Sequence, residues 1–241
     1  MNDRSADPVS EFRRVNVEAS VNLARQAADA GVRRFVFLSS IKVNGEGTES
    51  GKSFMADDIP LPLDPYGLSK LEAQQELEAI SRQTGIEIVI IRPPLVYGPG
   101  VKANFKVMMR WLDARIPLPF GAITQNRRSL VALENLVSLI SASLIHPAAA
   151  NRTFLVSDGE DLSTAELLRR MGSALGKPAR LFFSPPQLLK IGAMLLNKPD
   201  VFQRLCGSLQ VDIGKTIQML DWKPVVSVDE GLCIAARDML L

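Results

Sequence analysis

Two short apolar runs, each preceded by a helix-like segment, constrain the fold of this chain more than any other feature. Residues 35–38 read Phe-Val-Phe-Leu and residues 87–92 read Glu-Ile-Val-Ile-Ile-Arg, the composition of buried strands. Apolar residues recur at helical spacing over residues 9–30 before Gly31, and Pro65 opens a second helix that ends near Gly85. Helix, strand, helix, strand with connections of crossover length predicts a parallel α/β sheet.

The pattern changes beyond Pro99. One further strand is predicted at residues 153–156, and a polar turn at residues 125–129. Otherwise helical patterns dominate, over residues 105–114, 134–145, 163–175, 186–196, 201–205, 215–220 and 228–240. The sequence therefore predicts a second, smaller and mostly helical lobe.

Charge and hydropathy exclude several classes of protein. The 28 basic and 26 acidic residues are mixed along the chain, so no basic surface for nucleic acid or an anionic membrane is expected. The N-terminus is polar, which predicts no signal peptide. The most apolar run, residues 188–196, contains Lys190 and is too short to span a bilayer.

Cysteine and histidine usage points to a reducing compartment without a metal centre. Cys206 and Cys233 lie far apart among apolar residues, as core thiols would, which predicts a cytoplasmic protein. His146 is the single histidine and precedes Pro147, so no transition-metal site is expected.

A Tyr-x-x-x-Lys sequence stands at the start of the second helix. Tyr66 and Lys70 are four residues apart and therefore share one helix face. An ammonium near a phenol stabilises the phenolate and lowers its pKa from about 10, so the tyrosine can act as a general base or acid. The pair alone is weak evidence, because chance places such pairs on many helices and Tyr66 could simply pack at an aromatic surface.

Further motifs around this pair raise its significance. Ser39-Ser40 ends the first apolar strand, followed by Ile-Lys-Val-Asn-Gly. In this order and spacing the chain resembles the extended short-chain dehydrogenases/reductases of the NAD-dependent epimerase/dehydratase family, in the manner of UDP-glucose 4-epimerase. The resemblance covers nearly the whole chain. Its other matching motifs are residues 92–100 (Arg-Pro-Pro-Leu-Val-Tyr-Gly-Pro-Gly), Asn104-Phe105, Arg128 and residues 221–224 (Asp-Trp-Lys-Pro).

The resemblance implies a fold and a division of the chain. The fold class is α/β, a partial Rossmann-like parallel sheet with a smaller, mostly helical C-terminal substrate lobe. Residues 1–100 would form the C-terminal part of the dinucleotide-binding domain. Residues 101–241 would form the substrate-binding lobe, with some segments returning to the sheet.

The resemblance also implies roles for the reacting residues. Tyr66 would transfer the proton, and Lys70 would lower its pKa and hold the nicotinamide ribose of NAD. Ser40 would hydrogen-bond the reacting sugar hydroxyl, and the loop at Pro93 would lie over the nicotinamide. Another interpretation of Ser40 is that it caps a turn.

Three more residues are carried over for binding and support. Arg128 and Asn104 would hold the substrate diphosphate, a task that suits the planar fork of arginine. Arg128 could instead pair with Glu134. Asn16 would support the active site beside the cofactor, the alternative being a surface polar residue.

The glycine-rich turn that begins full-length family members has no counterpart here. Gly98 and Gly100 follow the wrong strand and open no suitable helix. We therefore expect the chain to begin just after the family's fourth strand, which would leave residues 35–38 as an uncovered apolar edge. The residue that selects between NAD and NADP would lie in the missing part, so that choice stays open.

Two positions bear on the reaction. Ile41 and Lys42 stand where the dehydratase branch carries an Asp-Glu pair, so dehydration is not expected. Leu95 stands where many 4-epimerases carry a substrate-binding asparagine. The resemblance thus predicts an NAD-dependent 4-epimerase of UDP-hexose or UDP-N-acetylhexosamine working through a 4-keto intermediate. The alternatives are an NAD(P)H-dependent reductase of nucleotide 4-keto-sugars and an inactive remnant. A nucleotide-sugar is the expected partner, and a homodimer is one open alternative for the assembly.

Overall fold

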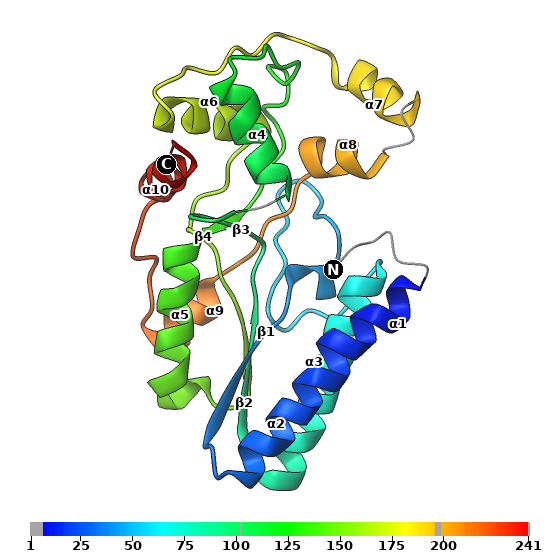
Figure 1. Ribbon diagram of the computed structural model, residues 1–241, viewed down its shortest axis with the longest axis vertical. Helices are drawn as coiled ribbons and strands as arrows, with labels where there is room; N and C mark the ends of the chain where they lie inside the picture. Colours follow the sequence, from blue (N-terminus) through cyan, green and yellow to red (C-terminus); the bar gives the residue numbers. More distant parts are fainter. Residues whose placement is uncertain (1–6, 102, 196–198, 241) are drawn as a thin grey trace.

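A parallel sheet forms the centre of the molecule in the computed structural model, which describes residues 7–101, 103–195 and 199–240. Its strands are β1 (Arg34–Leu38), β2 (Glu87–Arg92) and β5 (Arg152–Leu155), in the order β1-β2-β5. The shorter strands β3 (Leu95–Tyr97) and β4 (Leu130–Ala132), which the sequence pattern did not predict, form a second parallel pair (Figure 1). The predicted α/β class with a parallel sheet is confirmed.

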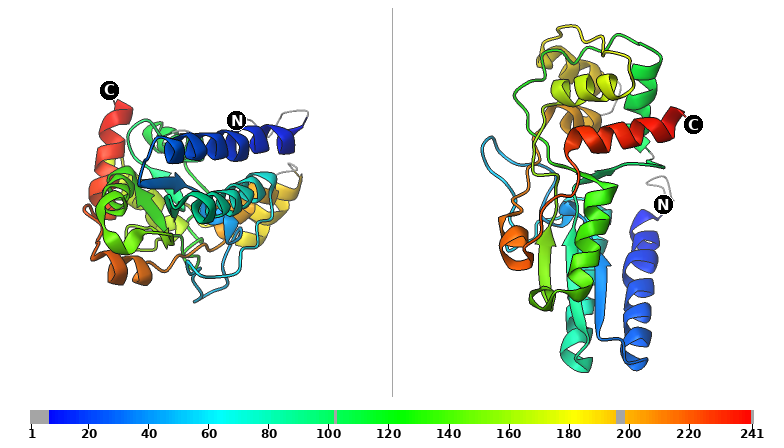
Figure 2. Two further views of the ribbon diagram at one scale, coloured as in Figure 1. Left: turned by 90° about the horizontal axis from the view of Figure 1, so that it is seen from below. Right: turned by 90° about the vertical axis from the view of Figure 1, so that its left-hand side faces the viewer.

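Helices lie on both faces of this sheet and above its carboxyl end (Figures 1 and 2). The helices beside the sheet are α1 (Pro8–Phe12), α2 (Ala19–Asp29), α3 (Pro65–Thr84), α5 (Leu133–Ile145) and α9 (Gly214–Leu220). Those of the upper part are α4 (Ala103–Asp113), α6 (Thr164–Ala174), α7 (Pro186–Leu195), α8 (Pro199–Cys206) and α10 (Val228–Leu240). The mostly helical character expected for the C-terminal part is confirmed.

Side chains of β2 alternate between two cores. Ile88 and Ile90 pack with residues of α2 and α3, whereas Val89 and Ile91 pack with residues of α5 and β5. Because successive side chains of a strand point to opposite faces, a strand covered by helices on both sides needs an unbroken apolar run. The run at residues 87–92 meets that need.

The N-terminal helix differs from the prediction of one regular helix over residues 9–30. A π-helical segment, Arg13–Glu18, lies between α1 and α2, and it buries Asn16 and Val17. A wider turn of this kind leaves no signature in apolar spacing, which explains why the sequence pattern missed it.

Strand β1 forms the edge of the sheet, as expected from the sequence. Among the described residues it pairs with β2 alone. Phe37 is buried under α2 and α3, but Leu38 at the end of the strand is 40% exposed. The end of this edge strand therefore presents a partly exposed apolar side chain.

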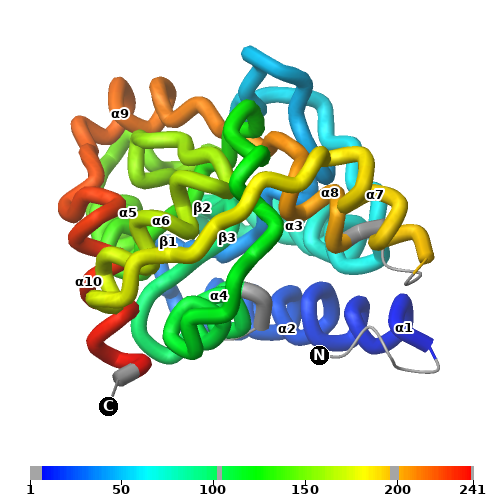
Figure 3. Tube along the Cα trace, turned by 90° about the horizontal axis from the view of Figure 1, so that it is seen from above, coloured from blue at the N-terminus to red at the C-terminus, as the bar shows by residue number. Residues whose placement is uncertain are grey.

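The helices of the upper part lie above the carboxyl ends of the strands (Figure 3), and they share a core of their own. Buried side chains of α4, α6 and α10 meet there, among them Phe105, Met171 and Leu232. The expectation of two core thiols is half right. Cys206 is half-buried, but Cys233 is exposed, because its neighbour Leu232 takes the inward position on α10.

Candidate functional site

The carboxyl end of β1 places a serine beside the start of α3. Ser40 has an extended backbone (φ −155°, ψ 149°) and precedes one turn of 3-10 helix, Ile41–Val43. Its Oγ accepts a hydrogen bond from the backbone N–H of Lys42 over 3.3 Å. Ser40 thus does cap a turn, and because a hydroxyl both accepts and donates, its proton can still serve a second partner.

The first turn of α3 brings Tyr66 and Lys70 to the same place. Asp64 is the N-cap, with Oδ1 accepting the Gly67 N–H over 2.6 Å, and Pro65 takes the first helical position. The Lys70 Nζ donates to the Leu38 carbonyl over 2.9 Å and lies 6.0 Å from the centroid of the Tyr66 ring. Ser40, Tyr66 and Lys70 are therefore gathered at the exposed end of β1, and all three are half-buried.

The electrostatic surroundings of Tyr66 differ from the simple expectation. Burial raises the pKa of Tyr66, whereas the charge of Lys42 and a hydrogen bond with Ser40 lower it and the charge of Asp64 raises it; the net shift is upward. The cation that opposes the rise is thus Lys42, although the sequence pattern assigned that effect to Lys70. Burial lowers the pKa of Lys70 itself.

Two contacts support Tyr66 from the N-terminal helix. The buried Asn16 side chain donates to the Ser69 Oγ over 2.9 Å, and that hydroxyl donates to the Tyr66 carbonyl over 2.8 Å. The Phe12 ring meets the Tyr66 ring edge-on at 5.6 Å. Asn16 is only 5% exposed, so its interpretation as a surface polar residue is wrong.

A buried polar network that sequence reasoning missed fixes the ends of β1 and β2. The Arg92 guanidinium donates to the Gln74 side chain over 2.6 Å and to the Asn44 side chain over 3.0 Å. The Gln74 amide donates to the Ser39 hydroxyl. Burial lowers the pKa of Arg92 to about 10. The sequence did contain one sign of this network, because Arg92 is a charged residue at the end of an otherwise apolar strand.

A loop from the end of β2 reaches the same place. Pro93 is buried, and its carbonyl accepts the Ile41 N–H over 3.0 Å. This bond ties the predicted nicotinamide loop to the Ser40 turn.

The two predicted diphosphate residues come from other elements. Arg128 donates to the Gly207 carbonyl over 3.2 Å. Burial lowers the pKa of Arg128, Arg204 lowers it further, and Glu46 opposes them. Glu46 and Arg204, rather than the Glu134 suggested by the sequence, are thus the charges that act on Arg128. Asn104 belongs to α4, but its side chain lies outside the described residues.

A second feature missed by sequence reasoning is an ion cluster beside Tyr66. The Lys42 Nζ lies 2.9 Å from the Glu46 Oε1 and also pairs with the Asp64 carboxylate. Lys42 is two residues from Ser40, and its sequence position indicated only that the Asp-Glu pair of the dehydratases is missing. No local spacing predicts that Asp64, 22 residues away, completes the cluster.

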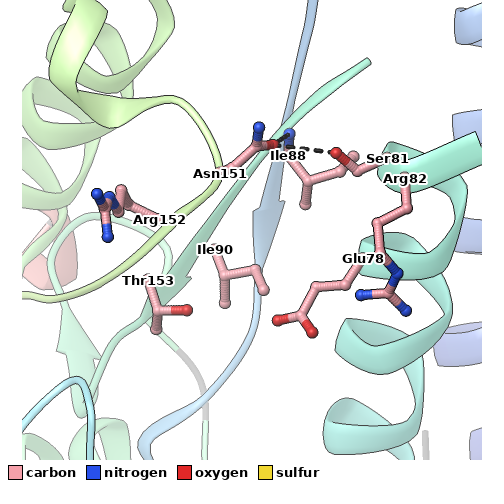
Figure 4. A pocket seen from close by; sticks show the side chains of 8 residues that line it. All are labelled: Glu78, Ser81, Arg82, Ile88, Ile90, Asn151, Arg152 and Thr153. Atoms are coloured by element: carbon pink, nitrogen blue, oxygen red, sulfur yellow. Dashed lines mark hydrogen bonds between the residues drawn. The ribbon is translucent and has the colours of Figure 1, made fainter. Parts of the chain in front are cut away.

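One cavity lies elsewhere, at the amino ends of β2 and β5. Its volume is about 280 Å³, and residues of α3, β2 and β5 line it (Figure 4). The Asn151 side chain accepts hydrogen bonds there from the Ser81 hydroxyl and the Ile88 N–H (Figure 4). In open parallel sheets ligands bind at the carboxyl ends of the strands, so this cavity is not the candidate site.

The described residues contain no group of three His, Cys, Asp or Glu side chains that could hold a metal ion. The ring of His146 accepts the Ala148 N–H at a helix end instead. No helix within the described ranges is long and apolar enough to cross a membrane.

The donor set at the end of β1 fits a nicotinamide ribose. The Lys70 ammonium has three donors and spends one on Leu38. Its remaining donors lie near the Tyr66 ring, with Nζ 6.0 Å from the ring centroid, at the exposed end of β1, where two adjacent ribose hydroxyls could bind. The residues present therefore suit the half of a dinucleotide that carries the nicotinamide.

Comparison with known proteins gives a consistent result. The model of the NAD dependent epimerase/dehydratase family matches residues 2–157. The chain is 51% identical over 240 residues to a UDP-glucose 4-epimerase of Vibrio cholerae, and the match covers 100% of this chain and 73% of that protein. It is 24% identical over 225 residues to a dTDP-4-dehydro-6-deoxyglucose reductase of Escherichia coli, which covers 90% of this chain and 65% of that protein.

The fold is also found among solved structures. The crystal structure of a UDP-glucose 4-epimerase from Thermotoga maritima, solved with UDP-glucose, superposes with a TM-score of 0.77 at 20% identity. The superposition covers 97% of this chain and 72% of that one. The partial Rossmann-like fold predicted from the sequence is thereby confirmed.

Proposed function

Since the chain belongs to the NAD-dependent epimerase/dehydratase family, we propose that its strand-end site inverts C4 of a nucleotide-linked hexose, a UDP-hexose or UDP-N-acetylhexosamine. The observation that carries this proposal is the meeting of Ser40, Tyr66 and Lys70 at the carboxyl end of β1. The 51% identity to the Vibrio cholerae UDP-glucose 4-epimerase supports the choice of reaction.

Each residue has a task in this reaction. NAD⁺, when bound, supplies the acceptor and later the donor of the C4 hydride. The Tyr66 phenolate oxygen would take the proton of the C4 hydroxyl as C4 becomes a ketone, and the resulting phenol would return that proton to the C4 oxygen when the ketone is reduced again from its other face. Ser40 donates a hydrogen bond to the same sugar oxygen. Lys70 binds the ribose of the cofactor, while the charge of Lys42 lowers the pKa of Tyr66.

Binding residues complete the proposal. Arg128 is half-buried and has donors beyond the one spent on Gly207, so it suits a diphosphate oxygen. Asn104 would contact the same group, and Pro93 would lie over the nicotinamide. Asn16 holds the backbone of Tyr66 through Ser69. In this scheme residues 1–100 hold the cofactor and residues 101–241 hold the nucleotide.

The test is interconversion of UDP-glucose and UDP-galactose, and of their N-acetylamino forms, with NAD⁺ supplied. We would assay the 241-residue chain and a version extended upstream in its reading frame, because the chain spans 73% of the length of the Vibrio relative. Activity that disappears in Tyr66→Phe supports the proposal. Absence of turnover in both versions contradicts it.

A reductase of 4-keto-sugars is the second candidate, because the match to the Escherichia coli reductase also covers most of this chain. The same residues would then run only the second half of the reaction. Release of one oxidised cofactor per turnover identifies a reductase, whereas an epimerase regenerates its cofactor. Size-exclusion chromatography with light scattering on the same samples decides between a monomer and a homodimer.

A further inference from the structure

Lys42 occupies a constrained position between the Ser40 turn and the start of α3. Its side chain is 26% exposed, and its ammonium lies between the carboxylates of Glu46 and Asp64. A lysine that neutralises two carboxylates holds them close together in a setting where they would otherwise repel each other.

The backbone of Lys42 connects the same elements. Its N–H donates to the Ser40 Oγ over 3.3 Å. Its carbonyl oxygen lies so near α3 that a Cβ on Gly67 would come within 2.9 Å of it, so glycine permits this approach. Lys42 therefore holds the serine and the helix that carries Tyr66 at a fixed distance.

Three elements that pack around Tyr66 carry charged groups. The Ser40 turn supplies Lys42 and, through it, Glu46. Helix α3 supplies Asp64 and the Lys70 ammonium, the latter 6.0 Å from the ring. The π-helical segment that follows α1 contributes Arg13, whose charge is matched by Glu72 in an exposed pair.

Within this set, Lys42 and Asp64 act in opposite directions. Lys42 lowers the pKa of Tyr66, and Asp64 raises it. Their contact with each other means that removing either one exposes Tyr66 to the uncompensated charge of its partner.

We propose that Lys42 is a positioning residue for proton transfer by Tyr66: held by Asp64 and Glu46, its ammonium offsets the negative charge beside the phenol and keeps Ser40 in place. The proposal rests on the proposed function for the use made of the Tyr66 proton. The effect of the Lys42 charge on the protonation of Tyr66 involves only residues of this chain. It can therefore be measured without substrate or cofactor.

The experiment is a direct titration of Tyr66 in the 241-residue chain. The chain has only two tyrosines, which allows labelling of both with ¹³C at Cζ and following two NMR signals. Tyr66→Phe assigns the signals. Tyr97 is 1% exposed and bonded to Asp158, so it stays protonated through the range in which Tyr66 titrates.

We expect Lys42→Met to raise the Tyr66 midpoint by about 0.5–1 pH unit, because Asp64 and Glu46 lose their counter-charge. Asp64→Asn should lower the midpoint by a similar amount while keeping the helix cap, because asparagine caps as well as aspartate. Lys42→Arg should titrate near the wild type. Lys52→Met is the matched control, since Lys52 pairs with Glu49 in the exposed loop that follows, and it should leave the midpoint unchanged.

Opposite shifts of the Tyr66 midpoint in Lys42→Met and Asp64→Asn support the proposal, because the direction of each shift then follows the charge that was removed. A purely structural role predicts no such dependence on charge. An unchanged midpoint in Lys42→Met, or shifts of the same sign, overturns it. If Lys42→Met does not fold, as judged by circular dichroism, Asp64→Asn decides alone: a lowered midpoint supports the proposal and an unchanged one overturns it. If the midpoints shift in opposite directions but the protein has no epimerase activity, the effect of the Lys42 charge on Tyr66 is supported and the proposed function is contradicted.

Discussion

The two tyrosines of the chain lie about thirty residues apart in sequence and in opposite electrostatic surroundings. Tyr97, at the end of β3, is 1% exposed, and its hydroxyl donates to the Asp158 carboxylate over 2.7 Å. Tyr66, at the start of α3, is half-buried between Lys42, Asp64 and Ser40. Burial is the largest cause of a raised pKa at both sites, and the neighbours then decide what the hydroxyl can do.

Asp158 reinforces burial at Tyr97. The nearby negative charge and the hydrogen bond to it both raise the pKa of Tyr97, so this hydroxyl remains a donor. At Tyr66, by contrast, a cation and a hydroxyl oppose the effect of burial. A phenol that must give and take a proton needs the second arrangement, whereas a phenol that ties β3 to the upper core needs the first.

The largest expected effect separates the two hydroxyls by activity. Tyr66→Phe should reduce 4-epimerisation by about 10²–10⁴-fold, the usual contribution of a positioned acid or base. Tyr97→Phe should leave kcat per folded molecule almost unchanged. The measurement is initial-rate kinetics of both variants at equal folded concentration. Equal losses in both variants would break the distinction between a reacting and a structural tyrosine.

The next effect compares the carboxylates beside the two tyrosines. Asp158 accepts from Tyr97, from the Ala132 N–H over 2.7 Å and from Asn135 over 2.7 Å. Asp158→Ala removes all three of these buried hydrogen bonds, and only Tyr97 and Asn135 keep another acceptor, the Val228 and Val226 carbonyls. The free energy of unfolding should fall by about 3 kcal/mol. Asp64→Ala removes a helix cap and should cost about 1 kcal/mol. Urea unfolding of both variants measures the difference, and a larger cost at Asp64 would contradict it.

Alkaline pH tests the same contrast through stability. A tyrosine whose pKa is raised by folding contributes stability that is fully present below the unfolded pKa, near 10, and is lost as the pH rises above it. The pKa of Tyr97 is raised well beyond that value. Above pH 10 the wild type should therefore lose up to about 1.4 kcal/mol per pH unit more than Tyr97→Phe. Parallel stability curves for the two proteins would show that Tyr97 ionises freely in the folded state.

Local sequence patterns predicted the strands, the helix start and the residue spacing around Tyr66. The apolar runs at residues 35–38 and 87–92 identified β1 and β2, and Pro65 marked the start of α3. The spacing of Tyr66 and Lys70 followed from helix geometry. Parallel topology then brought Ser40 to the same edge, because the carboxyl ends of parallel strands and the starts of the following helices meet there.

Long-range packing produced what the sequence could not predict. The pairing of Lys42 with Asp64 and the bonds from Arg92 to Gln74 and Asn44 depend on how loops fold onto strand ends. The exposure of Cys233 depends on a rotation of one residue about the axis of α10, which apolar composition alone does not reveal. The catalytic roles of Ser40, Tyr66 and Lys70 stay predictions until the kinetic measurements are made.

The smallest effect concerns the support beneath Tyr66. Asn16→Ala removes the hydrogen bond to the Ser69 hydroxyl, which still donates to the Tyr66 carbonyl, so the free energy of unfolding should fall by about 1 kcal/mol. Asn22→Ala, on the exposed face of α2, is the matched control and should be neutral or slightly stabilising, because alanine is the better helix former. The Cζ signal of Tyr66 should titrate at an unchanged midpoint in both variants, because neither residue carries a charge. A shifted midpoint in Asn16→Ala alone would mean that the helix support, and not only the Lys42 cluster, sets the protonation of Tyr66.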